Sequence, residues 1–219
     1  MFGNVFGKKD EVKPRHPGLP SPLALRLGAA VRLDSILSKV LSSDDYVFEL
    51  PDAGQVLSVV SQGVVDLGEG VKLHRFYFED DWWLQVKVSG AAATDPDAGV
   101  DEMHLFGFGD VLTPSSQAEF DQIASRIGLP SYSYAEKDYA RIWGQGSAVA
   151  ATADFDERVY PAAEASYGVR HQDMLYSRPV PGSPRAELLL VSTETTDSDE
   201  VTVVHSVGIP LDPSDLEIT

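Results

Sequence analysis

The chain has 219 residues, 43% of them hydrophobic, and 34 acidic against 17 basic residues give it a net charge of −17. This length provides one large or two small domains with a sizeable core, and the absence of cysteine excludes disulfides, thiol catalysis and cysteine-ligated metal sites. Residues 40–219 hold ten basic and thirty-one acidic residues, a net of −21. This body is expected to repel nucleic acid and to favour a basic protein partner; a solvated acidic surface without a partner is the alternative.

Residues 1–22 are predicted to be a disordered, basic, proline-rich tail, because four prolines oppose regular structure there. Lys8 and Lys9 lie near Phe2 and Phe6, a combination suited to weak contact with an anionic membrane or with a partner; a tail without a role is the alternative. No apolar stretch resembles a signal peptide or reaches the roughly 20 residues that cross a bilayer. We therefore expect a cytoplasmic protein.

Residues 23–112 are predicted to form a first β-rich lobe around the hairpin Val71–Val88. Bulky residues alternate on both faces of this hairpin, so it is expected to lie in a sheet that is covered on both sides. Trp82 and Trp83 are interpreted as core residues, with stacking on a ligand as the alternative. Gly63 interrupts the preceding β-rich stretch and is interpreted as a bulge or turn.

Residues 113–130 are predicted to form a linking helix. Ser116 and Glu119 have the spacing of a capping box at its start, and Gly128 followed by proline ends it. Strand patterns resume over residues 131–219, which are predicted to form a second β-rich lobe with an acidic C-terminal end.

The predicted fold is therefore mainly β, or α+β by count of its one or two helices. Antiparallel sheets are expected to form a two-lobed β-sandwich or half-barrel. Weak similarity at an offset of 98 residues favours an internal duplication, with chance similarity between β-rich segments as the alternative. The similar pairs are Phe76–Phe78 with Met174–Tyr176, and Asp101–Leu105 with Asp199–Val203.

No motif indicates a reaction centre. His74 and His104 lie in predicted strands and lack zinc-type spacing, and the Asp-rich stretch 95–101 lacks the glutamate that completes a calcium loop. Nucleophile motifs and phosphate-binding loops are missing as well. We expect no catalytic residue, no metal, no cofactor and no enzymatic activity; a metal-free hydrolase with a diffuse site is the least favoured alternative.

Five residues are candidates for binding a ligand or partner. Tyr139, Arg141 and Trp143 are expected on one strand face, a pattern suited to stacking between arginine and aromatic rings. Trp82 and Trp83 complete the set. The alternative for Arg141 is an alkyl stem packed over the edge of an aromatic core.

Short stretches along nearly the whole chain resemble the YjfK-like family of bacterial proteins. They are Leu25–Gly28, Leu73–Tyr77, Trp83–Val86, Tyr139–Gly144, Met174–Arg178 and Val207–Leu211. The family is one of unknown function, so the resemblance implies no catalytic residues. It implies a genomic context, because members are encoded beside a phage-shock-type membrane-stress protein, a small integral membrane protein and an ATP-grasp enzyme similar to glutathionylspermidine synthase.

From this context we expect a non-enzymatic cytoplasmic accessory or adaptor protein of an envelope-stress system. Its acidic surface would bind a protein, such as a membrane-associated stress protein. A small-molecule or peptide-binding module with a pocket of aromatic residues and arginine is the alternative.

Overall fold

The computed structural model describes residues 22–41, 43–52, 54–90, 99–144, 146, 148–161, 165–198 and 200–219. The tail residues Phe2, Phe6, Lys8 and Lys9 lie outside this part of the chain, so their role as a membrane or partner tether stays a prediction. Within the described part, no helix has the length and apolar character needed to cross a membrane.

The described residues form mainly antiparallel strands with short helices between them. The first strands are β1 (Ala30–Leu33), β2 (Leu57–Gly68), β3 (Val71–Phe78), β4 (Trp82–Ser89), β5 (Glu102–Leu112) and β6 (Ser131–Tyr134). The later strands are β7 (Lys137–Arg141), β8 (Ala153–Pro161), β9 (Tyr167–Arg178), β10 (Glu187–Thr196), β11 (Val201–Pro210) and β12 (Leu216–Ile218). The helices are α1 (Ser35–Val40) and α2 (Gln117–Ala124), with 3-10 turns at Pro22–Ala24 and Pro213–Asp215.

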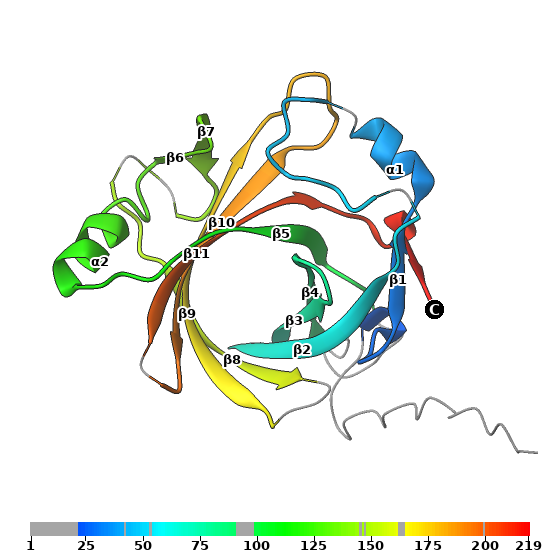
Figure 1. Ribbon diagram of the computed structural model, residues 1–219, viewed down its shortest axis with the longest axis horizontal. Coiled ribbons are helices and arrows are strands. Elements are labelled where there is room, and N and C mark those ends of the chain that lie inside the picture. The colour runs from blue at the N-terminus through cyan, green and yellow to red at the C-terminus, as the bar shows by residue number, and fades with distance from the viewer. Residues whose placement is uncertain are drawn as a thin grey trace, which may run out of the picture.

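Eight of these strands close into a barrel in the order β2-β3-β4-β5-β11-β10-β9-β8, with β8 pairing back onto β2. Figure 1 looks along this barrel and shows the strands as a ring. Leu105 of β5 lies opposite Ile209 of β11, and Gly63 of β2 lies opposite Val159 of β8. The predicted mainly β, antiparallel fold is confirmed, but the predicted two-lobed sandwich or half-barrel is wrong.

The physical reason for this correction is edge pairing. A half-barrel would leave the edges of β2 and β5 open, and open edges expose unpaired N–H and C=O groups. Here strands β8 to β11 from the second half of the chain pair with both of those edges. Each half therefore supplies four strands to one barrel, and whether the halves arose by duplication stays a prediction.

The hairpin β3–β4 has one face in the lumen and the other on the outside of the barrel. Arg75 and Trp83 point inward, whereas Phe76 and Leu84 point outward, because successive side chains on a strand alternate between faces. All four are almost fully buried. The prediction that both faces of this hairpin are covered is therefore confirmed.

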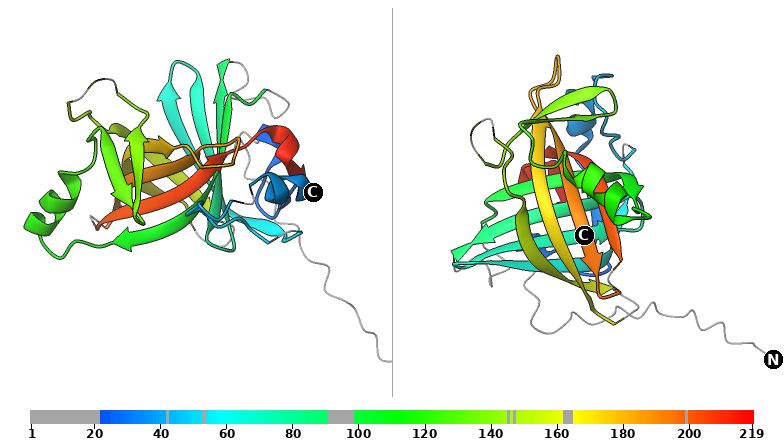
Figure 2. Two further views of the ribbon diagram at one scale, coloured as in Figure 1. Left: turned by 90° about the horizontal axis from the view of Figure 1, so that it is seen from above. Right: turned by 90° about the vertical axis from the view of Figure 1, so that its left-hand side faces the viewer.

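The larger hydrophobic core lies outside the barrel wall. Leu25, Val31 and Leu37, from the segment that contains β1 and α1, belong to the core that also contains the outward-facing side chains of β3 and β4. On the opposite side of the barrel, the hairpin β6–β7 and helix α2 stand away from the lumen, as Figure 1 and Figure 2 show. Tyr132 and Tyr139 from that hairpin belong to the same core.

Helix α2 begins where the sequence predicts but is shorter than the predicted 113–130. Ser116 is its N-cap and accepts a hydrogen bond from the backbone N–H of Glu119. The Glu119 carboxylate accepts from the backbone N–H and the hydroxyl of Ser115, rather than from the N-cap itself. Residues 125–128 are turns, and Gly128 has a positive φ of 87°, which stops the helix.

Candidate ligand site in the barrel lumen

The lumen is partly filled by apolar side chains and partly empty. Trp83, Phe106, Leu175, Leu188 and Leu190 pack together inside the barrel. A cavity of about 270 Å³ lies beside them, toward the end of the barrel that carries the β3–β4, β8–β9 and β10–β11 connections. Its lining residues are Ser61, Arg75, Tyr77, Trp83, Phe108, Glu157, Val159, Tyr167, Val169, His171, Leu190, Ser192, Glu194 and Ser206. Eight-stranded barrels of this kind have room for one small ligand.

A buried ion cluster forms the inner wall of this cavity. The Arg75 guanidinium donates to Glu157 Oε2 at 3.0 Å and to Asp173 Oδ2 at 2.9 Å, and its Nε donates to Gln85 Oε1 at 3.1 Å. His171 Nε2 lies 2.8 Å from Glu157 Oε2. The side chains of both carboxylates are fully buried. Charges removed from water in this way are costly unless they are paired, and here each has a partner.

The electrostatics keep Arg75 and Glu157 ionised. Burial alone would lower the pKa of Arg75, but Glu157 and Asp173 hold that pKa above its ordinary value. Burial alone would raise the pKa of Glu157, but the charge of Arg75 and hydrogen bonds from His171 and Tyr77 hold that pKa below its ordinary value.

Gly63 makes room for the Glu157 carboxylate. A Cβ atom at Gly63 would lie 1.6 Å from Glu157 Oε1, so no larger residue fits without movement of the carboxylate or the strand. Gly63 is a regular member of β2 rather than the expected bulge or turn, and the register shifts of β2 fall elsewhere, at Val59/Ser61 and Asp66/Gly68. Close approach of another chemical group is a second reason for glycine inside a strand.

His171 links Glu157 to Ser192, whose hydroxyl lies 3.1 Å from His171 Nδ1. A carboxylate, an imidazole and a hydroxyl in this order resemble the relay of a nucleophilic serine. Ser192, however, lies within β10 opposite Asp173 on one side and Val204 on the other. Backbone N–H groups inside a sheet are used in its ladders, so Ser192 has no oxyanion hole of the usual backbone type. The relay therefore positions the imidazole, and the absence of enzymatic activity stays a prediction.

Two groups on the cavity wall are available to a ligand, and in the adjoining ion cluster Asp173 Oδ1 has no hydrogen-bond partner among the described residues. The indole Nε1 of Trp83 has no hydrogen-bond acceptor among the described residues, although the side chain is only 3% exposed. The Glu194 carboxylate contacts His171 Nδ1 at 3.7 Å, and burial raises its pKa. Because buried polar groups in proteins are nearly always paired, the Trp83 indole indicates where a ligand would bind; the Glu194 side chain beside it is 27% exposed and accessible from the cavity.

Aromatic rings line the cavity next to the ion cluster, where the Tyr77 hydroxyl donates to Glu157 Oε1 at 2.9 Å. The ring centroid of Tyr77 lies 6.0 Å from that of Trp83 and 6.5 Å from that of Phe108. Phe108 and Tyr167 line the cavity and are each 41% exposed, so they mark its opening to solvent. The site thus combines apolar walls with a few placed polar groups, which is typical of small-molecule sites.

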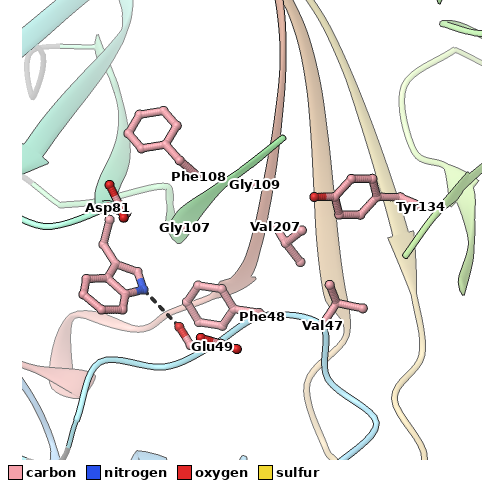
Figure 3. A pocket seen from close by; sticks show the side chains of 10 residues that line it. Val47, Phe48, Glu49, Asp81, Gly107, Phe108, Gly109, Tyr134 and Val207 are labelled. Atoms are coloured by element: carbon pink, nitrogen blue, oxygen red, sulfur yellow. Dashed lines mark hydrogen bonds between the residues drawn. The ribbon is translucent and has the colours of Figure 1, made fainter. Parts of the chain in front are cut away.

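A second depression lies on the outer face of the barrel (Figure 3), between the segment around Phe48 and the outer side of β4 and β5. It also has a volume of about 270 Å³, and Tyr134 of β6 lies on its rim. Its tryptophan, Trp82, already donates its indole N–H to the Glu49 carbonyl at 3.0 Å. This groove therefore lacks the unpaired indole that distinguishes the lumen.

The structure does not bring the five predicted binding residues together. Trp82 and Trp83 are neighbours on one strand and point to opposite sides of the wall, so only Trp83 lines the lumen cavity. Trp143 packs at the edge of the apolar lumen cluster and does not line the cavity.

Tyr139 and Arg141 have structural contacts outside the barrel. Tyr139 is fully buried and donates its hydroxyl to Glu187 Oε2 at 2.9 Å. Arg141 donates to the backbone carbonyls of Ala148 at 2.8 Å and Gly146 at 2.9 Å. Neither side chain reaches the lumen cavity.

His74 and His104 lie on opposite faces of the wall, because His74 points outward beside Phe76 whereas His104 points inward beside Phe106. Both pKa values are lowered, mainly by burial, and that of His74 falls to about 4. Across the described residues, no group of three or more histidine, cysteine or carboxylate side chains is placed to hold a metal ion.

Sequence reasoning missed Arg75, Glu157, His171, Asp173 and Glu194 as site residues. The available signal was polarity at inward positions. Arg75 lies between apolar residues on its own strand face. His171 and Asp173 are consecutive on one face of β9 and lie between Val169 and Leu175. That signal marks inward polar groups but does not identify their partners.

Comparisons with known proteins show which protein family this chain is related to. The family described as "Protein of unknown function (DUF2491)" matches residues 1–217. "Uncharacterized protein YjfK" of Escherichia coli (strain K12) is 25% identical over 146 residues, which are 65% of this chain and 62% of that protein. The match thus spans less than two thirds of that relative's length. No solved structure matches the chain significantly.

Proposed function

This chain belongs to the DUF2491 family of proteins of unknown function, and we propose that it binds a small organic molecule in the lumen of its barrel. The observation that carries the proposal is the Trp83 indole N–H, which is buried on the cavity wall without an acceptor among the described residues. A ligand with an acceptor atom at this position would satisfy the donor.

The surrounding wall supports the same function. The closed barrel encloses the cavity, and the buried ion pairs of Arg75 with Glu157 and Asp173 form its polar wall without a ligand. A preformed site avoids much of the entropy cost of ordering side chains on binding. Exposed Phe108 and Tyr167 give an apolar entrance.

Native mass spectrometry tests the proposal. The purified protein is incubated with the small-molecule fraction of a bacterial extract, desalted and weighed intact. Ser206 lines the cavity and is 2% exposed, so Ser206→Leu fills part of the space. Ser131→Leu, at an exposed position of β6 outside the barrel, is the matched control.

We expect one adduct on the wild type and on Ser131→Leu, and none on Ser206→Leu, with circular dichroism showing that all three proteins are folded. No adduct on the wild type, or an adduct that persists on Ser206→Leu, would overturn the proposal. If ordered water is the sole occupant of the cavity, the wild type shows no adduct, which is the first of these results.

A second candidate is the adaptor role that the family resemblance implies, and the exposed acidic turn Glu79, Asp80 and Asp81 between β3 and β4 favours it. We propose a basic protein partner, such as a membrane-associated stress protein, for this acidic surface. Charge-driven association weakens as salt screens it. A pull-down at low and at high salt, repeated with Glu79→Gln/Asp80→Asn/Asp81→Asn, should lose its partner at high salt and in the variant. Retention in both would refute this role.

A further inference from the structure

The charges around the lumen cavity do not balance. The positive charge of Arg75 is already paired, because each of its three nitrogens donates to Gln85, Glu157 or Asp173. Even if His171 is protonated, two positive charges face three carboxylates, those of Glu157, Asp173 and Glu194, which leaves −1. Of the three carboxylates, Arg75 pairs with Glu157 and Asp173 and not with Glu194, which lines the cavity with its side chain 27% exposed.

The environment of Glu194 is consistent with this count. Burial raises the pKa of Glu194 above its ordinary value, and Asp173 and Glu157 add to the rise. His171 and Arg75 oppose the rise without cancelling it. A carboxylate with too little positive charge nearby behaves in this way, and a cation beside it would restore the ionised form.

The aromatic side of the cavity suits the same ligand. Tyr77, Trp83 and Phe108 form a group of adjoining rings, and the Trp83 ring already has the Arg75 guanidinium carbon 5.1 Å from its centroid. Ring faces attract cations, most strongly where water is excluded. The exposed acidic turn at Asp80 and Asp81 lies at the same end of the barrel and raises the local concentration of cations.

We infer that the lumen ligand is a small organic cation, with an ammonium group between Glu194 and the aromatic rings and an oxygen atom that accepts from Trp83 Nε1. This inference rests on the proposed function and names its ligand class. An anionic ligand would instead face a net negative wall.

Isothermal titration with matched probes tests the inference. Choline carries a quaternary ammonium and a hydroxyl, and 3,3-dimethylbutan-1-ol is its neutral isostere. Tetramethylammonium and ethanolamine complete the panel. We expect at least one of the cations to bind, and choline to bind at least about tenfold more tightly than its isostere.

Two variants locate the charge. Glu194→Gln should weaken cation binding by about tenfold or more and leave binding of the neutral isostere unchanged. Glu217→Gln, at an exposed position of β12, should change neither. In the wild type, cation affinity should fall as the pH is lowered and Glu194 gains a proton, and this pH dependence should be lost in Glu194→Gln.

Equal affinity for choline and its isostere, or an unchanged cation affinity in Glu194→Gln, would overturn the inference. Failure of all three cations to bind would overturn it as well. The extract experiment decides separately whether the cavity binds any small molecule, so the two failures are distinguishable.

Discussion

Replacing Arg75 by methionine removes the guanidinium that neutralises Glu157 and Asp173 inside the barrel. Both ion pairs are short, at 3.0 and 2.9 Å, and the side chains of both carboxylates are fully buried. Methionine retains most of the volume of the arginine stem, so the change tests charge rather than packing. We expect Arg75→Met to leave two uncompensated charges in a site that water barely enters.

The expected loss follows from this geometry. Removing one partner of a buried ion pair costs about 3–5 kcal/mol. At about 2–4 °C per kcal/mol for a chain of this size, the melting temperature should fall by about 6–20 °C. A domain with about 5–15 kcal/mol of stability remains largely folded after such a loss.

The pH dependence gives a second signature. In the wild type, the pKa of Glu157 lies below its ordinary 4.5, so its carboxylate stabilises the fold above that pH, and the contribution is lost as the pH falls through the lowered value. In Arg75→Met, Glu157 loses the positive charge that opposes burial, so its pKa rises and it takes up a proton at a higher pH. The penalty of the substitution should therefore shrink between about pH 8 and about pH 5.

Urea unfolding followed by the fluorescence of the three tryptophans measures both effects. Arg170→Met is the matched control, because Arg170 forms an ion pair of similar length with Asp154, but with 62% and 42% of the two side chains exposed. It should leave the free energy of unfolding nearly unchanged. If Arg75→Met behaves like Arg170→Met at pH 8, or loses the same stability at pH 5 as at pH 8, the reasoning is refuted.

Three further predictions concern single side chains. Trp83→Ala should cost about 3–5 kcal/mol of unfolding free energy, whereas Trp83→Phe should keep most of it; equal melting temperatures for Trp83→Ala and the wild type would contradict burial of the ring. Burial, with a smaller effect of Lys72, lowers the pKa of His74 from 6.5 to about 4. The neutral imidazole therefore stabilises the fold above pH 6.5. This contribution of about 3 kcal/mol is lost as the pH falls from 6.5 to about 4. Denaturation of His74→Leu and the wild type between pH 7 and 4 should show a gap that changes with pH, and parallel curves would argue against a neutral His74. Gly63→Ala should lower the free energy of unfolding by roughly 1–3 kcal/mol, because its Cβ would lie 1.6 Å from Glu157 Oε1. An unchanged melting temperature would show that the carboxylate lies elsewhere.

The sequence alone was sufficient for features that depend on neighbouring residues. Alternation of bulky side chains predicted the hairpin that the structure places at β3 and β4, with both faces covered. It also required Trp82 and Trp83 to lie on opposite faces of their strand, since the period of a strand is two. Ser116 was recognisable as a helix cap because its hydrogen bond reaches only three residues along the chain.

Closure of the barrel and composition of the site depended on tertiary structure. Closure requires β5 to pair with β11 and β2 with β8, and no local pattern distinguishes these pairings from the open edges of two separate sheets. Alternation could not say which face of β4 would become the lumen, and therefore could not choose between Trp82 and Trp83 as the cavity residue. Arg75 finds its carboxylates 82 and 98 residues further along the chain, in a sequence with 34 acidic residues, and most of the acidic side chains that the structure describes are exposed. The choice of Glu157 and Asp173 is made by strand register, which is a property of the whole closed sheet rather than of any segment.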